Sequence, residues 1–360
     1  GTPKRSARAI AESVDAVGGD MNAFTTKEYT AFYIRLLSEH VDLGLDLLCD
    51  VMWSPAFRPD EVEAERQVIL EEIAMRGDEP ADLVHECFAA AQFPRHPLGR
   101  EVVGEPGTIG AMSSEDIRAF FSHHYRPGNM VVSVAGDLEH ESIAKGIEAR
   151  FAGSSGGAAP VRHPPTDDPL TLSVTRRPTE QAHLVLGAPA PSRHDQRRWS
   201  LAVLNHALGG GLSSRLFQEI RERRGLAYSV YSERVGYDDT GSLCVYAGTS
   251  PERAHQVVGL INHELDRLGE GITSQELELA KGHLRAQTLL SLEDSGARMG
   301  RIGRSMLLHG ELLTVEDVLS RIASVGLEDV REIARSIMSA PRTLAVVGPF
   351  DSDDLSLTAR

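Results

Sequence analysis

Apolar positions follow helix spacing in some segments and strand spacing in others, and one order of segments occurs twice. Residues 113–136, SSEDIRAFFSHHYRPGNMVVSVAG, predict a helix, a turn and a buried strand, and residues 325–348, VGLEDVREIARSIMSAPRTLAVVG, predict the same elements. The strand glycines Gly136 and Gly348 lie 212 residues apart. Self-similarity at such a long offset indicates duplicated domains rather than short solenoid repeats.

A second pair of segments supports the duplication. Residues 28–52 predict a strand followed by a long helix, and so do residues 241–268. At this offset, residues 169–212 have no counterpart in the first half, although they predict a strand over 179–190 and a helix over 197–211. We therefore expect the N-terminal lobe to lack a strand and a helix that would lie before Gly1, so that the chain as given starts late.

The fold class follows from this repeat. Residues 153–168, GSSGGAAPVRHPPTDD, are small, polar and rich in glycine and proline, which is typical of a linker. They separate an N-terminal lobe, 1–152, from a C-terminal lobe, 169–360. We predict an α+β fold of two duplicated lobes, each with a mainly antiparallel sheet and helices packed on it.

Composition narrows the function. With 360 residues, 41% hydrophobic and 25% charged, the chain is globular. Its formal charge of −15 argues against nucleic acid as a partner, and the acidity serves either solubility or attraction of basic peptides. No apolar run is long enough to span a membrane. Three scattered cysteines without a CxxC pair indicate reduced thiols and a cytoplasmic location.

Two carboxylates fall on one face of a predicted helix. Residues 60–75, DEVEAERQVILEEIAM, have helical spacing, with an apolar stripe at Val62, Ile69 and Ile73. Glu65 and Glu72 are seven residues apart, which places them two turns from each other on the same face. This pair either binds a metal or forms part of a solvated acidic face.

An arginine and a tyrosine are predicted to meet across a turn. In residues 208–228, Gly209 to Gly211 end one helix, and Ser213 or Ser214 caps a second helix that ends at Gly225. Arg221 lies in its last turn and Tyr228 opens the following strand. The pair could hold a substrate carbonyl or an oxyanion, or it could be a surface arginine beside a tyrosine at the edge of the core.

The histidines do not complete a zinc motif. His85, His140 and His263 each precede a glutamate, but none belongs to an HExxH motif, and HxxEH does not occur. Since a catalytic zinc normally has three protein ligands, the sequence as it stands does not hold a complete site.

The order of these segments resembles the pitrilysin/insulinase-type metallopeptidases, the inverzincins. The similarity covers essentially all 360 residues and is closest to the small class that includes the β-subunit of the mitochondrial processing peptidase. It is carried by GTPKRSA, VGGDMNAFTTKEYTAFY, RPDEVEAERQVILEEI, HPLGREVVGE, HHYRPGNMVVSVAGDL and GGGLSSRLFQEIRERRGLAYSVYS.

The resemblance implies a role for each candidate residue. Glu72 falls on the third zinc ligand and Glu65 on a supporting glutamate, while the two histidine ligands and the catalytic base belong to an HxxEH helix that this sequence lacks. Asn22 and Ala23 fall on the strand that pairs with the substrate backbone. Arg221 and Tyr228 fall on the residues that hold the scissile region.

Two functions remain open. The first is a zinc metalloendopeptidase that cleaves peptides or unfolded segments inside a chamber formed by a clamshell of lobes, with one zinc per complete chain, and it works as a homodimer or a heterodimer. The second is a non-catalytic partner subunit that supplies Arg221 and Tyr228 or scaffolds an assembly. Because Glu65 and Glu72 both occupy family positions, the first is favoured.

Overall fold

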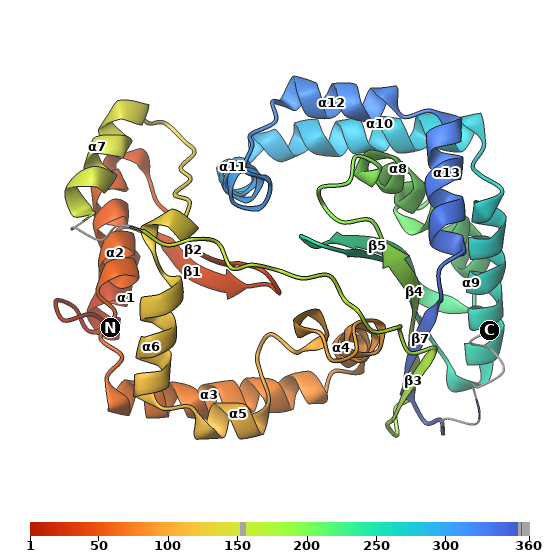
Figure 1. The fold of residues 1–360 in the computed structure, drawn as a ribbon, viewed down its shortest axis with the longest axis horizontal. Coiled ribbons are helices and arrows are strands. Elements are labelled where there is room, and N and C mark those ends of the chain that lie inside the picture. The colour runs from red at the N-terminus through yellow and green to blue at the C-terminus, as the bar shows by residue number, and fades with distance from the viewer. Residues whose placement is uncertain (152–155, 352–353, 355–360) are drawn as a thin grey trace. The chain divides into compact units, whose positions relative to one another are not determined.

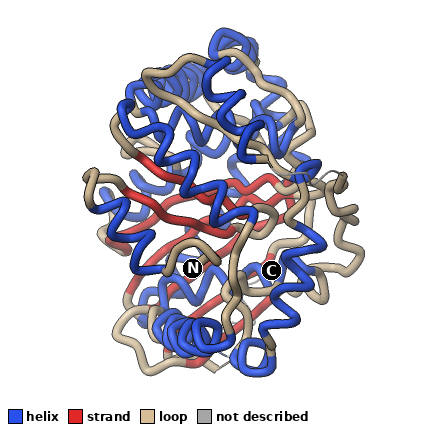
Figure 2. Tube along the Cα trace, turned by 90° about the vertical axis from the view of Figure 1, so that its left-hand side faces the viewer, coloured by secondary structure: helices blue, strands red, loops and turns tan. Residues whose placement is uncertain are grey.

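The computed structural model describes residues 1–151, 156–351 and 354. Its contacts divide the chain into two compact units. Unit 1 consists of Gly1–Ile73, Val102–Val161 and Ser291–Leu312, and unit 2 consists of Ala74–Glu101, Arg162–Leu290 and Leu313–Arg360. Both units combine helices with a sheet, which confirms the predicted α+β class (Figure 2).

Unit 2 is built on a five-stranded sheet (Figure 1). Its strand order is β3-β7-β4-β6-β5, and every neighbouring pair is antiparallel except β3 and β7, which are parallel. The strands are β3 (Leu172–Arg176), β4 (Ala182–Ala190), β5 (Ala227–Gly236), β6 (Gly241–Thr249) and β7 (Thr343–Gly348). The strand predicted over 179–190 is therefore confirmed as β4.

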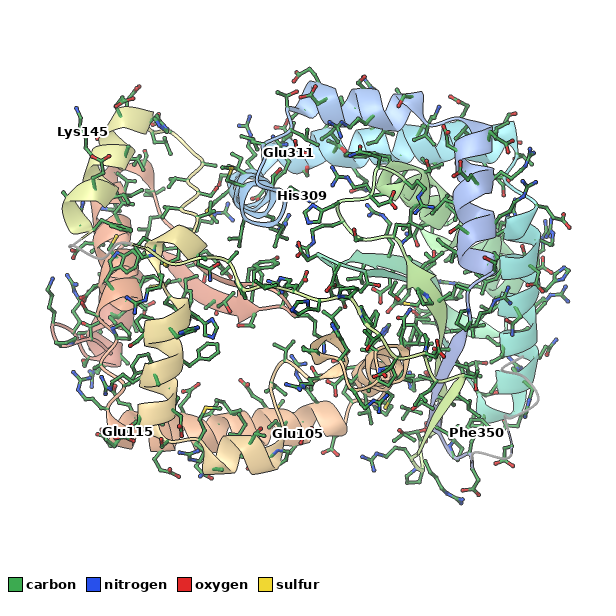
Figure 3. All side chains as sticks on the ribbon, viewed as in Figure 1. Glu105, Glu115, Lys145, His309, Glu311 and Phe350 are labelled. Atoms are coloured by element: carbon green, nitrogen blue, oxygen red, sulfur yellow. The ribbon has the colours of Figure 1, made fainter. Side chains whose placement is uncertain are left out.

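Helices cover both faces of this sheet. They are α4 (Pro80–Gln92), α8 (Arg198–Gly209), α9 (Ala254–Gly269), α10 (Ser274–Leu290), α12 (Val315–Ser324) and α13 (Leu327–Met338). Alternate residues of each central strand enter different cores: in β4, Leu184 and Leu186 pack with α8, α9 and α13, whereas Val185 packs with α4. Strands buried on both faces read as continuous apolar runs, as β4 and β7 do. Phe350 is buried just beyond β7 and belongs to the larger core (Figure 3).

Unit 1 contains a two-stranded antiparallel sheet and mostly half-buried helices. Its elements are α1 (Ala7–Asp15), β1 (Asp20–Thr25), β2 (Thr30–Arg35), α2 (Val41–Trp53), α3 (Pro59–Gly77, whose last residues pass into unit 2), α5 (Pro106–Ala111), α6 (Ser114–His124), α7 (His140–Arg150) and α11 (Ser295–His309). The predicted pairs of repeats match, because β2 precedes α2 as β6 precedes α9, and α6 corresponds to α13.

The strand predicted near residues 130–136 is wrong. Among the described residues this segment forms no strand, whereas its counterpart in the second half is β7. In the sheet, β7 lies between β3 and β4. Both of these neighbours come before residue 213, which is the counterpart of Gly1 at the offset of 212, so the first half contains no counterpart of either strand. Without such neighbours the backbone has no ladder to join, and the exposed fractions of Val131 and Val132 are 38% and 57%.

The two repeats exchange a helix. α4 belongs to the first half of the sequence but lies on the sheet of unit 2, and α11 belongs to the second half but is part of unit 1. In unit 1 the Ser133 hydroxyl donates to the carbonyl oxygen of Met299 in α11, at 2.8 Å. The compact units therefore differ from the contiguous lobes 1–152 and 169–360. Residues 153–155 of the expected linker lie outside the described residues, and residues 156–168 contain no helix or strand.

Buried apolar side chains are few in unit 1. Among its described residues they are Val14, Leu45, Leu47 and Ile143. Over its 19 residues α3 contains no buried residue, so the predicted apolar stripe of this helix is only half covered. Both clusters of buried apolar residues lie in unit 2.

Candidate functional site

Strand β1 offers an open edge. Among the described residues it pairs only with β2, where Asn22 stands opposite Tyr33 and Ala23 opposite Phe32. Asn22 and Ala23 are exposed. The backbone N–H of Ala23 donates to Oδ1 of Asn22 at 2.8 Å, so a side-chain oxygen satisfies a donor that a further strand could use. An edge of this kind can receive an extended peptide by strand addition.

Glu65 and Glu72 both lie on α3, and both are exposed. Their spacing of seven residues places them on one face of the helix. No group of three or more His, Cys, Asp or Glu side chains within the described ranges is placed to hold a metal ion. A catalytic zinc needs about three protein ligands, so these residues by themselves do not fit a zinc site.

In unit 2 the structure brings Arg221 and Tyr228 together, as the spacing predicted. The guanidinium carbon of Arg221 lies 4.8 Å from the ring centre of Tyr228 and 4.8 Å from that of Phe217. The exposed fraction of Tyr228 is 81%. Two aromatic rings thus orient a planar cation whose N–H groups can still bind a carbonyl or carboxylate.

A glycine turn sets this geometry. Arg221 belongs to a π-helical segment, Phe217–Glu222, which is shorter than the predicted helix that Ser213 or Ser214 caps and that runs to about Arg224. Gly225 has φ of +59°, a left-handed conformation that favours glycine. The N–H groups of Gly225 and Leu226 donate to the carbonyl oxygens of Arg221 and Ile220, at 3.0 and 2.9 Å. The turn then directs the chain into β5, which begins next to Tyr228.

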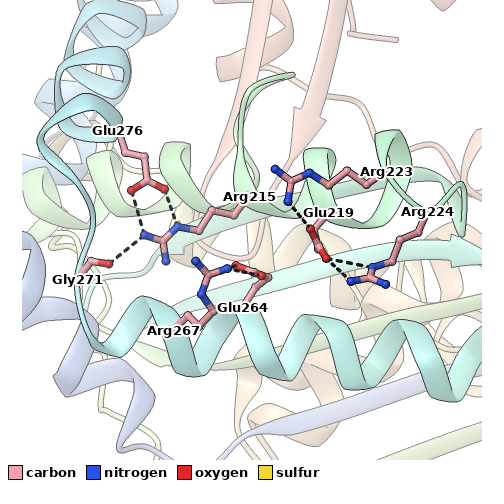
Figure 4. A network of polar contacts seen from close by, with 8 residues as sticks. All are labelled: Arg215, Glu219, Arg223, Arg224, Glu264, Arg267, Gly271 and Glu276. Carbon is pink, nitrogen blue, oxygen red and sulfur yellow. Dashed lines mark hydrogen bonds and ion pairs between the residues drawn. The ribbon is translucent and has the colours of Figure 1, made fainter.

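An ion pair attaches the Arg221 segment, residues 215–222, to α10 (Figure 4). Arg215 donates through Nε and Nη2 to the two carboxylate oxygens of Glu276, at 2.6 and 3.0 Å, and through Nη2 to the carbonyl oxygen of Gly271 at 3.0 Å. Burial alone would raise the pKa of Glu276, but hydrogen bonds from Arg215 and Thr273 outweigh it and lower the pKa to about 2. Glu276 is therefore ionised across the neutral and mildly acidic range.

Comparison with known proteins identifies the family. Residues 1–105 match the model of the insulinase family (peptidase family M16), and residues 111–284 match that of the peptidase M16 inactive domain. An uncharacterized zinc protease of Streptomyces coelicolor is 45% identical over 365 residues, which cover 99% of this chain and 80% of the relative. The chain belongs to the insulinase family of peptidases. The predicted family membership is thus confirmed.

A further relative and two solved structures extend the likeness. An uncharacterized zinc protease of Mycobacterium tuberculosis is 42% identical over 357 residues, covering 98% of this chain and 82% of the relative. The crystal structure of a peptidase M16 inactive domain from Pseudomonas fluorescens has a TM-score of 0.88 at 22% identity, covering 98% of this chain and 85% of that one. A protease from Helicobacter pylori gives a TM-score of 0.86 at 23% identity, covering 96% and 86%. At these identities the two structures establish the fold.

Sequence reasoning missed several residues that contact Arg221 or attach its segment. Phe217 forms the second ring beside Arg221, and Arg215 with Glu276 attaches the segment. Only the i, i+4 spacing of Phe217 and Arg221 could have indicated the aromatic partner, because residues four apart are neighbours on a helix. The pairing of Arg215 with Glu276 is long-range and carries no local signal.

No helix in the described part of the chain is long and apolar enough to cross a membrane.

Proposed function

We propose that this chain is the peptide-binding framework of a zinc-dependent endopeptidase that hydrolyses peptides or unfolded segments in an enclosed chamber. The observation that carries the proposal is the arrangement of Arg221, whose guanidinium group lies against two aromatic rings while its side chain stays partly exposed. Such a group is suited to hold a peptide carbonyl oxygen. Family membership supplies the reaction class.

The roles of the chain's own residues follow from their positions. In this proposal an extended substrate adds to the edge of β1, where its carbonyl oxygen replaces Oδ1 of Asn22 as the acceptor of the Ala23 backbone N–H. Arg221 and Tyr228 hold and polarise the scissile carbonyl. The exposed hydroxyl of Tyr228 and the N–H groups of Arg221 are both donors, which an oxygen that gains negative charge requires.

The metal centre needs residues beyond these 360. We propose that Glu72 provides one zinc ligand with Glu65 in support, and that an HxxEH helix together with a preceding strand completes the N-terminal lobe. Two features support a missing strand and helix: unit 1 buries few apolar side chains among its described residues, and residues 131–135 form no ladder. The counterparts in unit 2, β4 and α8, occupy the centre of its sheet and its core.

Zinc analysis of the complete encoded protein tests this proposal. We expect about one zinc per chain in that protein, loss of the metal in Glu72→Gln, and no stoichiometric zinc in the 360-residue chain. Glu71→Gln is the matched control, because Glu71 is the adjacent exposed residue on another face of α3. A complete protein that holds no zinc would overturn the peptidase role for this chain.

A second function, a non-catalytic partner subunit, has one observation in its favour. The described residues hold no group able to bind a metal, and the sequence has no HxxEH. In that case a catalytic partner would carry the zinc, and Arg221→Ala in this chain would abolish cleavage by the pair whereas Glu72→Gln would leave it intact. The same zinc measurement therefore separates the two functions. We propose a dimer for both, which sedimentation of the complete protein tests.

A further inference from the structure

Two histidines of unit 2 stack beneath the glycine-rich turn. His206 of α8 and His283 of α10 have ring centroids 4.1 Å apart and planes inclined by 19°. The exposed fraction of His206 is 9%. Burial, and then the neighbouring His283, lower the pKa of His206, although a hydrogen bond with the backbone of Gly210 opposes the shift, so that the ring is neutral at neutral pH. Two neutral rings can stack at this distance, whereas two imidazolium ions would repel each other.

The glycine-rich turn lies directly against the ring of His206. A Cβ atom on Gly210 would come within 2.9 Å of Nδ1 of His206, and one on Gly211 within 3.0 Å of Cε1. On the other side, a Cβ on Gly209 would lie 2.5 Å from the backbone nitrogen of Ser232 in β5. The turn therefore fits between the imidazole and the sheet, and its position depends on where the imidazole stands.

The same turn leads into the segment that carries Arg221. From Gly211 the chain reaches Arg215 in four residues and Arg221 in ten. Helix α10 contacts α8, just before the turn, through His283 stacked on His206, and it contacts the Arg221 segment through Glu276 paired with Arg215. The first contact consists of two imidazoles, which can take up protons, whereas the second stays ionised on mild acidification because the pKa of Glu276 is about 2.

We propose that the His206–His283 stack is a pH-sensitive support that positions the turn at residues 209–211, and through it Arg221, for peptide binding. The link to peptide binding rests on the function proposed above. Protonation of His206 forces the rings apart and loosens the turn, while the Arg215–Glu276 pair keeps the segment attached to α10. Peptide binding then weakens on acidification without unfolding of unit 2.

The surroundings of the pair favour this titration. His283 is the ionisable group that acts on His206, and the packed elements α9, α12, α13 and β5 contribute no described charge to the pKa shift of His206. Charged side chains of α9, α10 and α12 have other partners than His206. Lys281 of α10 donates to the carbonyl oxygen of Ala323, Arg321 of α12 lies over Trp199, and Glu264 of α9 pairs with Arg267. No carboxylate among the described residues thus compensates a charge on His206.

Hydrogen exchange of the chain at pH 7.5 and pH 5.5, corrected for intrinsic rates, tests the switch directly. We expect amides of residues 209–216 to exchange faster at pH 5.5, by up to about tenfold for each pH unit below the pKa of His206. His206→Phe keeps a ring against His283 but cannot take a proton at this position, so it should keep these amides protected at both pH values. Unchanged exchange in the wild-type chain, or a full pH response in His206→Phe, overturns the proposal.

Binding of fluorescein-labelled β-casein, an unfolded polypeptide, provides the second readout. The wild-type chain should bind less tightly at pH 5.5 than at pH 7.5, and His206→Phe should bind equally at both. If no β-casein binds at any pH while exchange follows the histidines, the proposed function fails and the switch stands. If β-casein binds without pH dependence in the wild-type chain, the switch fails and the proposed function stands.

Discussion

Glu86 of α4 carries a carboxyl group in an unfavourable place. Its Oε1 atom lies 3.6 Å from Nη1 of Arg76, and the side chain is half-buried beside Glu101. Burial, and then repulsion from Glu101, raise the pKa of Glu86 to about 6, although Arg76 opposes the shift. The native protein thus prefers the protonated carboxyl, while the unfolded chain ionises it near pH 4.3.

Glu86→Gln should therefore stabilise the protein in a pH-dependent way. A raised pKa gives stability that is fully present below the unfolded value and is lost as the pH rises through about 6. The neutral amide avoids that loss, so we expect a gain of at most about 2 kcal/mol in the free energy of unfolding at pH 7.5, and little change at pH 4. Urea unfolding at both pH values measures it.

A matched control is Glu328→Gln, because Glu328 pairs with Arg331 on the exposed face of α13. Its effect should stay below about 1 kcal/mol and should not grow with pH. A gain for Glu86→Gln that is equal at pH 4 and pH 7.5 would contradict the assignment of the raised pKa to this carboxyl.

Phe217 should matter for peptide binding without touching the peptide. Its ring centre lies 4.8 Å from the guanidinium carbon of Arg221, at the same distance as the ring centre of Tyr228. A cation–π contact at a partly exposed site contributes about 0.5–1 kcal/mol. Phe217→Leu should thus weaken β-casein binding about two- to fivefold, as measured by fluorescence anisotropy. Tyr228→Phe, which keeps its ring, serves as the comparison; equal binding by wild type and Phe217→Leu would exclude a positioning role for Phe217.

At the scale of elements, the hydrophobic pattern predicted those whose neighbours lie in this chain. β4, α8, α13 and the strand–helix pairs were anticipated because their apolar spacing is local. The strand expected near residues 130–136 failed because a strand needs a partner, which spacing cannot supply. Arg221 and Tyr228 were placed together because a glycine turn fixes their separation, whereas the stack of His206 on His283 depends on packing between distant helices.

The ion pair between Arg215 and Glu276 should stabilise the Arg221 segment more than a neighbouring pair does. Arg215 and Glu276 have side-chain exposures of 13% and 24% and make two direct contacts. Glu276→Gln removes the charge that a half-buried arginine requires, at a cost of about 1–3 kcal/mol. We expect a lower unfolding free energy and faster amide exchange over residues 215–222. Stability should also fall in wild type as the pH drops from about 4.3 toward 2, because the pKa of Glu276 is lowered to about 2.

Glu219→Gln is the control on the same segment. Glu219 binds Arg223 and Arg224, which remain 72% and 45% exposed (Figure 4). Exposed pairs contribute at most about 1 kcal/mol, so this variant should unfold almost as wild type does. Equal losses for Glu276→Gln and Glu219→Gln would show that burial does not distinguish the two pairs.

At the scale of the whole molecule, each compact unit contains a helix from the other half of the sequence: α4 of the first half belongs to unit 2, and α11 of the second half belongs to unit 1. One face of the five-stranded sheet, with Val185, Tyr246 and Val347, is covered by Val84 and Phe88 of α4. This helix comes from the first half of the chain. A sequence-based boundary at the glycine- and proline-rich segment marks where the repeat begins but cannot show that a helix crosses to the other unit.

The exchange predicts how a fragment behaves. Residues 162–360 contain every strand of the five-stranded sheet but not α4, so one apolar face would be open to water. We expect this fragment to bind the dye ANS and to aggregate, and a fusion that restores residues 74–101 to reverse both effects. In the full chain, Phe88→Ala should cost about 3–5 kcal/mol, since Phe88 is 5% exposed. A fragment 162–360 that is monomeric, free of ANS binding and as stable as the fusion would contradict this account, because the face that α4 covers would then need no cover.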